Sequence, residues 1–189
     1  KVYSIEANPE LILLMEYSLQ LNGANDRVKV INRAVSEKSD ETVVLGFSDS
    51  IGGTSIRLTN AEKKIYVKTI ALDAILEYEP RIDFVKLDIA GSEELAWKGM
   101  QHIRKVNPAC VCLMEFSPVH YSNKGRDFFN QLLNDNYVSY INHDGDELLI
   151  YDFKIFEQTN YQWQMLVIRS KIVENLPDRK SIITYLQSM

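Results

Sequence analysis

Carboxylates that could take part in chemistry stand near the ends of three apolar segments of this sequence. Glu6 closes the first six residues, Asp88 lies near the end of residues 84–89, and Glu115 lies near the end of residues 109–116. A carboxylate at the tip of a buried strand can bind a ribose diol, attract a cation or accept a proton. The spacing therefore predicts a site that gathers acids from distant parts of the chain.

The segment around Asp88 predicts a strand followed by a helix. Residues 84–89 are apolar on both faces and end before Gly91, as in a buried parallel strand. Asp88 would then lie at the carboxyl end, where open α/β sheets bind ligands. The alternative is that Asp88 only caps the next helix. Lys86 shares a strand face with Asp88, and an ion pair that keeps Asp88 charged is favoured over a catalytic role.

The beginning of the chain predicts a βαβ crossover. Asn8 as N-cap and Pro9 at the first helical position open a helix that Asn22 and Gly23 end, and residues 28–32 form the next strand. One face of this helix is lined by Leu11, Leu14, Met15, Ser18 and Leu19. Glu6, at the tip of the first strand, either binds both ribose hydroxyls of a nucleotide or is a solvated strand-end acid.

The remaining elements are predicted from the periodicity of apolar residues and from the residues that form turns. We expect further strands at residues 42–47, 65–69 and 109–116, short antiparallel strands at 137–141, 148–151 and 164–168, and helices at 72–78, from Gly91 to about Met100, at 126–134 and within 171–189. The polar loop 48–55 is either a lid or a hairpin connection. Glu115 should face a crevice or pair with a cation, and His120 and Tyr121 follow it in the loop 117–124.

Bulk properties indicate one α/β domain of 189 residues. The formal net charge of −5 argues against a nucleic-acid-binding surface, and no segment is long enough to cross a membrane. Cys110 and Cys112 are expected to be reduced core thiols of a cytoplasmic protein. The sequence leaves the oligomeric state open and is compatible with a homo-oligomer.

The order of these pieces resembles the FkbM-type family of S-adenosylmethionine-dependent methyltransferases. The resemblance spans most of the chain and rests on five segments in sequence order: Ile5-Glu6-Ala7-Asn8-Pro9, Asn32-Arg33-Ala34-Val35-Ser36, Gly52-Gly53-Thr54-Ser55-Ile56, Thr69-Ile70-Ala71-Leu72-Asp73 and Val85-Lys86-Leu87-Asp88-Ile89-Ala90-Gly91-Ser92-Glu93. The last segment is similar to the family block Lys-Ile-Asp-Val-Glu-Gly-x-Glu, with Ala90 in place of the first glutamate.

The resemblance implies a Rossmann-like class I methyltransferase sheet, mostly parallel, with antiparallel C-terminal strands and flanking helices. It also implies that the chain starts at the family's second strand, so that the first central strand and its Gly-rich turn are missing from residues 1–189. That strand would lie between the one ending at Glu6 and the one ending at Asp88. We therefore expect an N-terminally incomplete domain in which residues 2–5 do not pair directly with residues 84–89.

The resemblance further implies S-adenosylmethionine as cofactor, with Glu6 on the ribose and Asp88 facing the methyl group and the acceptor. Asn32, Arg33 and Ala34 would lie near the adenine, with Ala34 as an apolar wall. Glu115 and His120 are the next candidates for a general base or for contact with the substrate. A Mg²⁺ site formed by Asp88, Glu115 and a nearby acid or histidine is a disfavoured alternative, and no metal ligand is assigned.

The function implied is O-methylation of a hydroxyl on a sugar, a polyketide or a similar small molecule. The alternative is a methyltransferase-like domain without activity, which binds or assembles; Ala90 and the missing Gly-rich turn favour it. Glu6, Asp88 and Glu115 at three successive strand ends favour the active methyltransferase over the inactive domain. A nucleotide-sugar or dinucleotide enzyme is a weaker third option.

Overall fold

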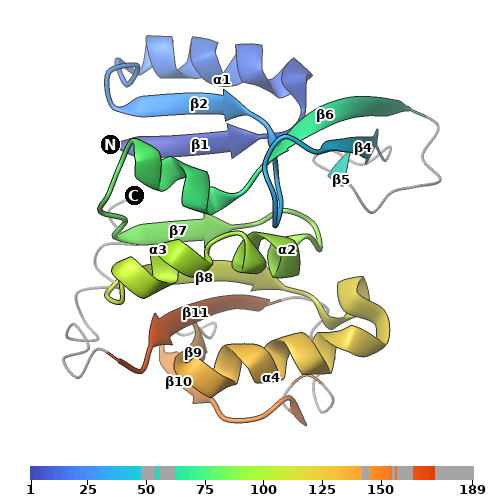
Figure 1. Cartoon of the computed structure of the whole chain (residues 1–189), viewed down its shortest axis with the longest axis vertical. Helices are drawn as coiled ribbons and strands as arrows, with labels where there is room; N and C mark the ends of the chain where they lie inside the picture. Colours follow the sequence, from blue (N-terminus) through green and yellow to red (C-terminus); the bar gives the residue numbers. More distant parts are fainter. Residues whose placement is uncertain (48–53, 56–62, 142–144, 155, 157–163, 173–189) are drawn as a thin grey trace. The chain divides into compact units, whose positions relative to one another are not determined.

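The chain divides into two units, each with its own sheet structure. Unit 1 comprises residues 1–78 and 94–101, and unit 2 comprises residues 79–93 and 102–189. The structure is a computed structural model, and it describes residues 1–47, 54–55, 63–141, 145–154, 156 and 164–172 (Figure 1).

Unit 1 begins with the predicted βαβ crossover. Strand β1 (Val2–Glu6), helix α1 (Pro9–Leu21) and strand β2 (Val28–Asn32) follow in order, and β1 pairs with β2 in parallel (Figure 1). The Asn8 side chain accepts a hydrogen bond from the Glu10 amide at 2.9 Å. Asn8 is therefore the N-cap that the sequence predicts, and it fixes where α1 leaves β1.

Helix α1 has no fully buried residue in the structure. Of its predicted apolar face, Met15 and Leu19 are half-buried, whereas Leu14 is 64% exposed. Leu13 and Tyr17 are exposed as well. Apolar spacing therefore predicted the helix correctly but overstated how much of that face is covered.

A second, four-stranded sheet completes the strands of unit 1. Its order is β3-β6-β4-β5, with β3 parallel to β6 and the other pairs antiparallel. The bounds are Ala34–Val35 for β3, Thr42–Phe47 for β4, Thr54–Ser55 for β5 and Lys64–Ile70 for β6. β4 and β5 form a hairpin, and residues 48–53 of the predicted polar loop lie outside the described residues.

The core of this sheet is small, and one close backbone contact lies beside it. Ala34, Leu45 and Val67 are buried together. The Asp73 amide of the 3₁₀ helix η1 (Leu72–Glu77) donates a hydrogen bond to the Gly99 carbonyl oxygen at 2.8 Å.

Unit 2 contains a five-stranded mixed sheet in the order β10-β9-β11-β8-β7. β7 and β8 are parallel, and the remaining pairs are antiparallel, as predicted for the C-terminal strands. The bounds are Phe84–Leu87 for β7, Val111–Phe116 for β8, Asn136–Ile141 for β9, Glu147–Ile150 for β10 and Gln164–Ser170 for β11.

The helices after β7 differ in detail from those predicted. The single helix expected to end near Met100 is two short helices, α2 (Glu93–Lys98) and α3 (Gln101–Val106). The expected loop after Ser117 is the 3₁₀ helix η2 (Pro118–Lys124), which leads directly into α4 (Gly125–Asp135). Local 3₁₀ turns leave little periodic signal in a sequence.

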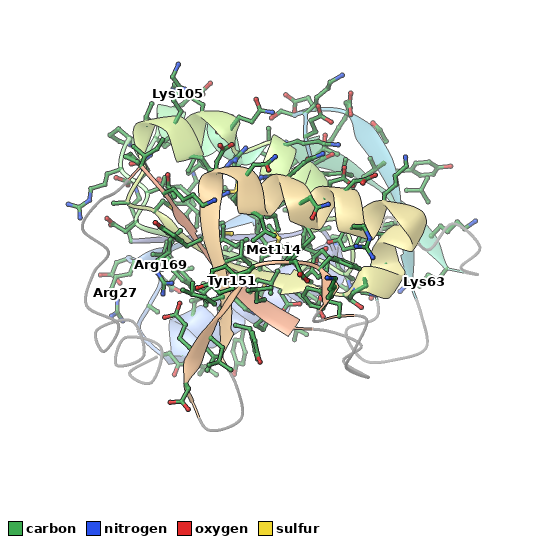
Figure 2. The ribbon with its side chains drawn as sticks, turned by 90° about the horizontal axis from the view of Figure 1, so that it is seen from below. Arg27, Lys63, Lys105, Met114, Tyr151 and Arg169 are labelled. Atoms are coloured by element: carbon green, nitrogen blue, oxygen red, sulfur yellow. The ribbon has the colours of Figure 1, made fainter. Side chains whose placement is uncertain are left out.

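The two faces of the unit 2 sheet differ in character. Alternation along β8 and β11 places Met114 on one face and Arg169 on the other (Figure 2). Met114 is fully buried, and Phe116 on the same face contacts the aromatic rings of Phe128 and Phe129 from α4. The side chain of Arg169 is only 9% exposed, because it pairs with Glu147.

The strands β1 and β7 belong to different sheets, and in the described part of the chain no ladder joins them. The direct pairing that would contradict a missing central strand is therefore not seen among these residues, while the strand itself stays a prediction. The helix predicted within 171–189 falls almost wholly outside the described residues. None of the described helices combines the length and apolar character needed to cross a membrane.

Candidate functional site

Asp88 and Glu115 come together at the carboxyl ends of two neighbouring parallel strands. Lys86 of β7 lies opposite Leu113 of β8, so two residues further along Asp88 comes opposite Glu115 on the same face. A hydrogen bond with Asp88 is among the causes that raise the pKa of Glu115, in keeping with this placement. The sequence predicts these two acids at strand ends on one rim together with Glu6, and their role in a site stays a prediction.

Lys86 supplies the positive charge of this site. Its Nζ lies 2.9 Å from Asp88 Oδ2, and both side chains are about half exposed. The ion pair predicted from their shared strand face is therefore present. An exposed pair of this kind contributes at most about 1 kcal/mol to stability.

The pKa of Glu115 is raised above its ordinary value. Burial is the largest cause, and the neighbouring carboxylates of Asp88 and Glu93 add to it, as does the hydrogen bond with Asp88. Lys86 opposes the shift. A carboxyl group with a raised pKa can hold a proton or take one up closer to neutral pH than an ordinary glutamate.

The side chain of Glu93 is hydrogen-bonded to the backbone of the turn that follows Asp88. Its side chain is 1% exposed, and its Oε1 accepts hydrogen bonds from the amides of Ile89 at 3.0 Å and Gly91 at 3.2 Å. Ala90 and Gly91 both have positive φ, of 50° and 91°. Backbone amides arranged in this way form a concave site that binds an anion. Here the bound anion is the carboxylate of Glu93, a residue of the same chain.

Tyr121 holds the second oxygen of that carboxylate. Its hydroxyl donates to Glu93 Oε2 at 2.7 Å, and its side chain is 3% exposed. The ring stacks on Phe116, with centroids 5.3 Å apart, and Phe116 directly follows Glu115 in β8. The Glu93 carboxylate is thus hydrogen-bonded from both sides.

In unit 1, Glu6 lies where β1 turns into α1. Its Oε1 accepts the Asn8 amide at 2.6 Å, and Oε2 accepts no hydrogen bond from the described residues. The backbone carbonyl of Glu6 accepts from the Arg33 amide and from Asn32 Nδ2. The carboxylate therefore retains one oxygen for an outside donor.

The residues predicted near an adenine surround the same strand end. Asn32 is exposed, and its Nδ2 also donates to the Ala7 carbonyl at 3.1 Å. Arg33 directs Nη1 to the Asn32 carbonyl. Ala34 is 3% exposed within the core of unit 1, so it offers little surface to a ligand. The described contacts thus leave Asn32 and Arg33 as the better placed of the three.

The predicted residues therefore form two groups. Asp88 and Glu115 meet in unit 2, and Glu6 with Asn32 and Arg33 meet in unit 1. His120 lies on η2 with an exposed side chain. Their convergence on one rim stays a prediction.

The sequence reasoning gave no role to Glu93 and named Tyr121 only as a loop residue. A glutamate directly after a turn is ordinarily interpreted as a solvent-exposed acid in the first turn of a helix. Its burial depends on a hydroxyl 28 residues further along the chain. A weak signal was available, because Gly91 and Glu93 recur in the block that carries the family resemblance.

The described residues contain no group of three or more His, Cys, Asp and Glu side chains arranged to hold a metal ion. Cys110 and Cys112 are free thiols. Burial, with a smaller contribution from Asp83, raises the pKa of Cys110 to about 12, so this thiol is a poor nucleophile at neutral pH.

A mixed α/β fold with acids at the carboxyl ends of parallel strands is typical of enzymes that bind ligands at that edge. The model of the methyltransferase FkbM domain matches residues 1–161 of this chain. The chain therefore belongs to the FkbM methyltransferase domain family. The fold and family expected from the sequence are confirmed.

A solved methyltransferase structure is similar to this chain in fold. The methyltransferase FkbM of Methylobacillus flagellatus KT matches with a TM-score of 0.53 and 18% identity, over 89% of this chain and 36% of that one. A precorrin-8w decarboxylase of Methanobacterium thermoautotrophicum matches with a TM-score of 0.44 and 16% identity, over 90% of this chain and 69% of that one. The chain thus spans about a third of the first relative's length. Among curated protein sequences, none matches significantly.

Proposed function

We propose that this chain is the methyl-transferring part of an S-adenosylmethionine-dependent O-methyltransferase whose acceptor is a hydroxyl of a sugar, a polyketide or a similar small molecule. The observation that carries the proposal is the meeting of Asp88 and Glu115 at adjoining strand ends, in a chain of the FkbM family. The cytoplasm is the proposed location, since free Cys110 and Cys112 suit a reducing compartment.

The residues of unit 1 fit the ribose of this cofactor. Glu6 is held by the Asn8 amide through Oε1 and keeps Oε2 for a hydroxyl donor. Asn32 Nδ2 and the Arg33 amide are engaged by backbone carbonyls, so Asn32 Oδ1 and the Arg33 guanidinium are the groups that could approach an adenine. When bound, the cofactor supplies a methyl group on a positively charged sulfur.

The acid pair supports proton transfer from a hydroxyl acceptor. In a displacement of this kind, the acceptor oxygen forms a bond to the methyl carbon as the carbon–sulfur bond breaks, and the acceptor loses its proton. Asp88, which pairs with Lys86, can attract the sulfonium or accept that proton. Glu115, whose pKa is raised by burial and by the neighbouring carboxylates, is the group to which the proton can pass.

The activity experiment uses formation of S-adenosylhomocysteine as a readout common to all acceptors. The full chain is incubated with S-adenosylmethionine and a panel of sugars, polyketides and simple alcohols. We expect turnover with a hydroxyl compound, reduced about 100-fold or more in Asp88→Asn and Glu115→Gln, the size of a typical general-base effect. Glu94→Gln is the matched control, because Glu94 pairs with Lys98.

Turnover that survives both acid substitutions would contradict the assigned roles of Asp88 and Glu115. Turnover only with amine acceptors would contradict O-methylation. The alternative of an inactive binding domain gains no support from the comparisons, and it would be favoured by cofactor binding without turnover of any acceptor.

A further inference from the structure

The turn from Asp88 to Glu93 is built around an internal anion. Two consecutive residues with positive φ, Ala90 and Gly91, bring the amides of Ile89 and Gly91 onto one oxygen of Glu93. Left-handed backbone costs energy for a residue with a Cβ, so Ala90 adopts it only because the surroundings hold it there. The Glu93 carboxylate provides that restraint.

The same carboxylate also reaches the neighbouring strand through Tyr121. The phenol donates to Glu93 Oε2, and its ring is stacked on Phe116, which adjoins Glu115. The turn that follows Asp88 is thus hydrogen-bonded to Glu93. Glu115 directly precedes Phe116, whose ring stacks on Tyr121. The Glu93–Tyr121 hydrogen bond therefore links the backbone next to Asp88 with the packing next to Glu115.

We propose that Glu93 and Tyr121 are positioning residues, which hold the turn after Asp88 so that its carboxyl group meets that of Glu115. This inference rests on the proposed function for its catalytic meaning, because it concerns the acid pair assigned to the acceptor's proton. Neither residue is assigned contact with cofactor or acceptor. Both side chains are almost completely buried, as a supporting role requires.

A purely electrostatic role for Glu93 is the competing explanation. Its charge alone contributes to the raised pKa of Glu115, after burial and the charge of Asp88. The charged and titratable groups around Glu115 are Asp88 and Lys86 from the β7 side, Glu93 from α2 and Tyr121 from η2. A test must therefore change the length of the side chain at position 93 without changing its charge.

Two variants of the full chain separate reach from charge. Glu93→Asp keeps the charge, but its shorter side chain cannot contact both the turn amides and Tyr121. Tyr121→Phe keeps the ring stacked on Phe116 and removes the hydroxyl that donates to Glu93. Glu94→Asp and Tyr151→Phe are matched controls, since Glu94 pairs with Lys98 and Tyr151 is 81% exposed.

The readout is the carboxyl titration of Glu115, followed by NMR, together with thermal unfolding of each variant. We expect both variants to lower the pKa of Glu115 toward its ordinary value, because the hydrogen bond with Asp88 loosens. The controls should titrate like the unchanged protein. A lowered unfolding temperature with an unchanged Glu115 titration in Tyr121→Phe would overturn the proposal, whether or not Glu93→Asp folds.

A parallel titration with S-adenosylmethionine keeps this test separate from that of the function. If the unchanged chain does not bind the cofactor, the proposed function fails, while the Glu115 titration still decides whether Glu93 and Tyr121 position the acid pair. If it binds and the two variants bind equally well with a shifted Glu115 titration, the positioning role on the acceptor side is supported.

Discussion

Asp88 and Glu115 lie opposite each other where β7 and β8 end, and a hydrogen bond with Asp88 is among the causes that raise the pKa of Glu115. Burial is the largest of these causes, followed by the neighbouring charges of Asp88 and Glu93. The Lys86 ammonium, which pairs with Asp88 at 2.9 Å, opposes the shift.

The first prediction concerns Glu115→Gln and pH. Because burial and the nearby carboxylates raise the pKa of Glu115 in the folded protein, its protonated form stabilises the fold. This contribution is fully present below the ordinary glutamate pKa and is lost as pH rises through the raised value. Glutamine stays neutral, so the variant should gain stability relative to the parent as pH rises, by less than about 1 kcal/mol for a partly exposed group.

Urea unfolding at a series of pH values from acid to neutral measures this effect. Glu94→Gln serves as the control, because its partner is Lys98 rather than a carboxylate. Parallel stability curves for Glu115→Gln and the unchanged chain would show that Glu115 has no raised pKa.

The second prediction concerns the backbone of Ala90, which has a φ of 50°. Glycine adopts this conformation without the Cβ penalty, so Ala90→Gly should stabilise unit 2 by about 1 kcal/mol in thermal or urea unfolding. The reverse change next to it, Gly91→Ala, should destabilise by at least a similar amount, because Gly91 has a φ of 91°. A destabilising Ala90→Gly would mean that the turn is not strained.

The third prediction concerns Gly99, between α2 and α3. A Cβ at this position would clash with the Ser36 carbonyl oxygen, which is backbone and cannot move aside cheaply. Gly99→Ala should destabilise the protein by about 1–3 kcal/mol. Gly23→Ala is the comparison, because a Cβ at Gly23 meets nothing within 4 Å and the cost there comes from its φ of 59° alone. Equal costs would argue against the close contact.

The fourth prediction concerns the buried ion pair of Arg169 and Glu147, whose side chains are 9% and 10% exposed. Arg169→Met leaves a buried carboxylate that has lost its cation and should cost about 3–5 kcal/mol in urea unfolding. Replacing both residues by leucine should recover much of this loss. The exposed pair of Arg81 and Asp83 is the control, and Arg81→Met should cost at most about 1 kcal/mol.

An equal loss from Arg169→Met and Arg81→Met would show that burial does not set the strength of these pairs. Ser139 also donates its hydroxyl to Glu147, so part of the loss in Arg169→Met is offset by a hydrogen bond that remains.

Local signals predicted the early part of the fold well. Asn8 and Pro9 mark the start of α1, and both are found where a cap and a first helical residue were expected. The two apolar runs predicted strands β7 and β8 with an acid near the end of each, whereas their direct pairing comes from the structure. The helix cap and the strand patterns need only a few neighbouring residues.

The features that the sequence did not predict depend on contacts between distant residues. The break between α2 and α3 follows Gly99, whose close neighbour is Ser36. The burial of Glu93 depends on Tyr121. Such pairings arise from tertiary packing, and neither member carries a local sign of its partner.

Calorimetric titration measures whether the full chain binds S-adenosylmethionine through Glu6. We expect saturable binding to the unchanged protein and binding weakened about tenfold or more in Glu6→Ala, because a charge-assisted hydrogen bond is lost. Absence of binding to the unchanged chain would contradict the methyltransferase assignment, and equal affinity in Glu6→Ala would remove Glu6 from the site.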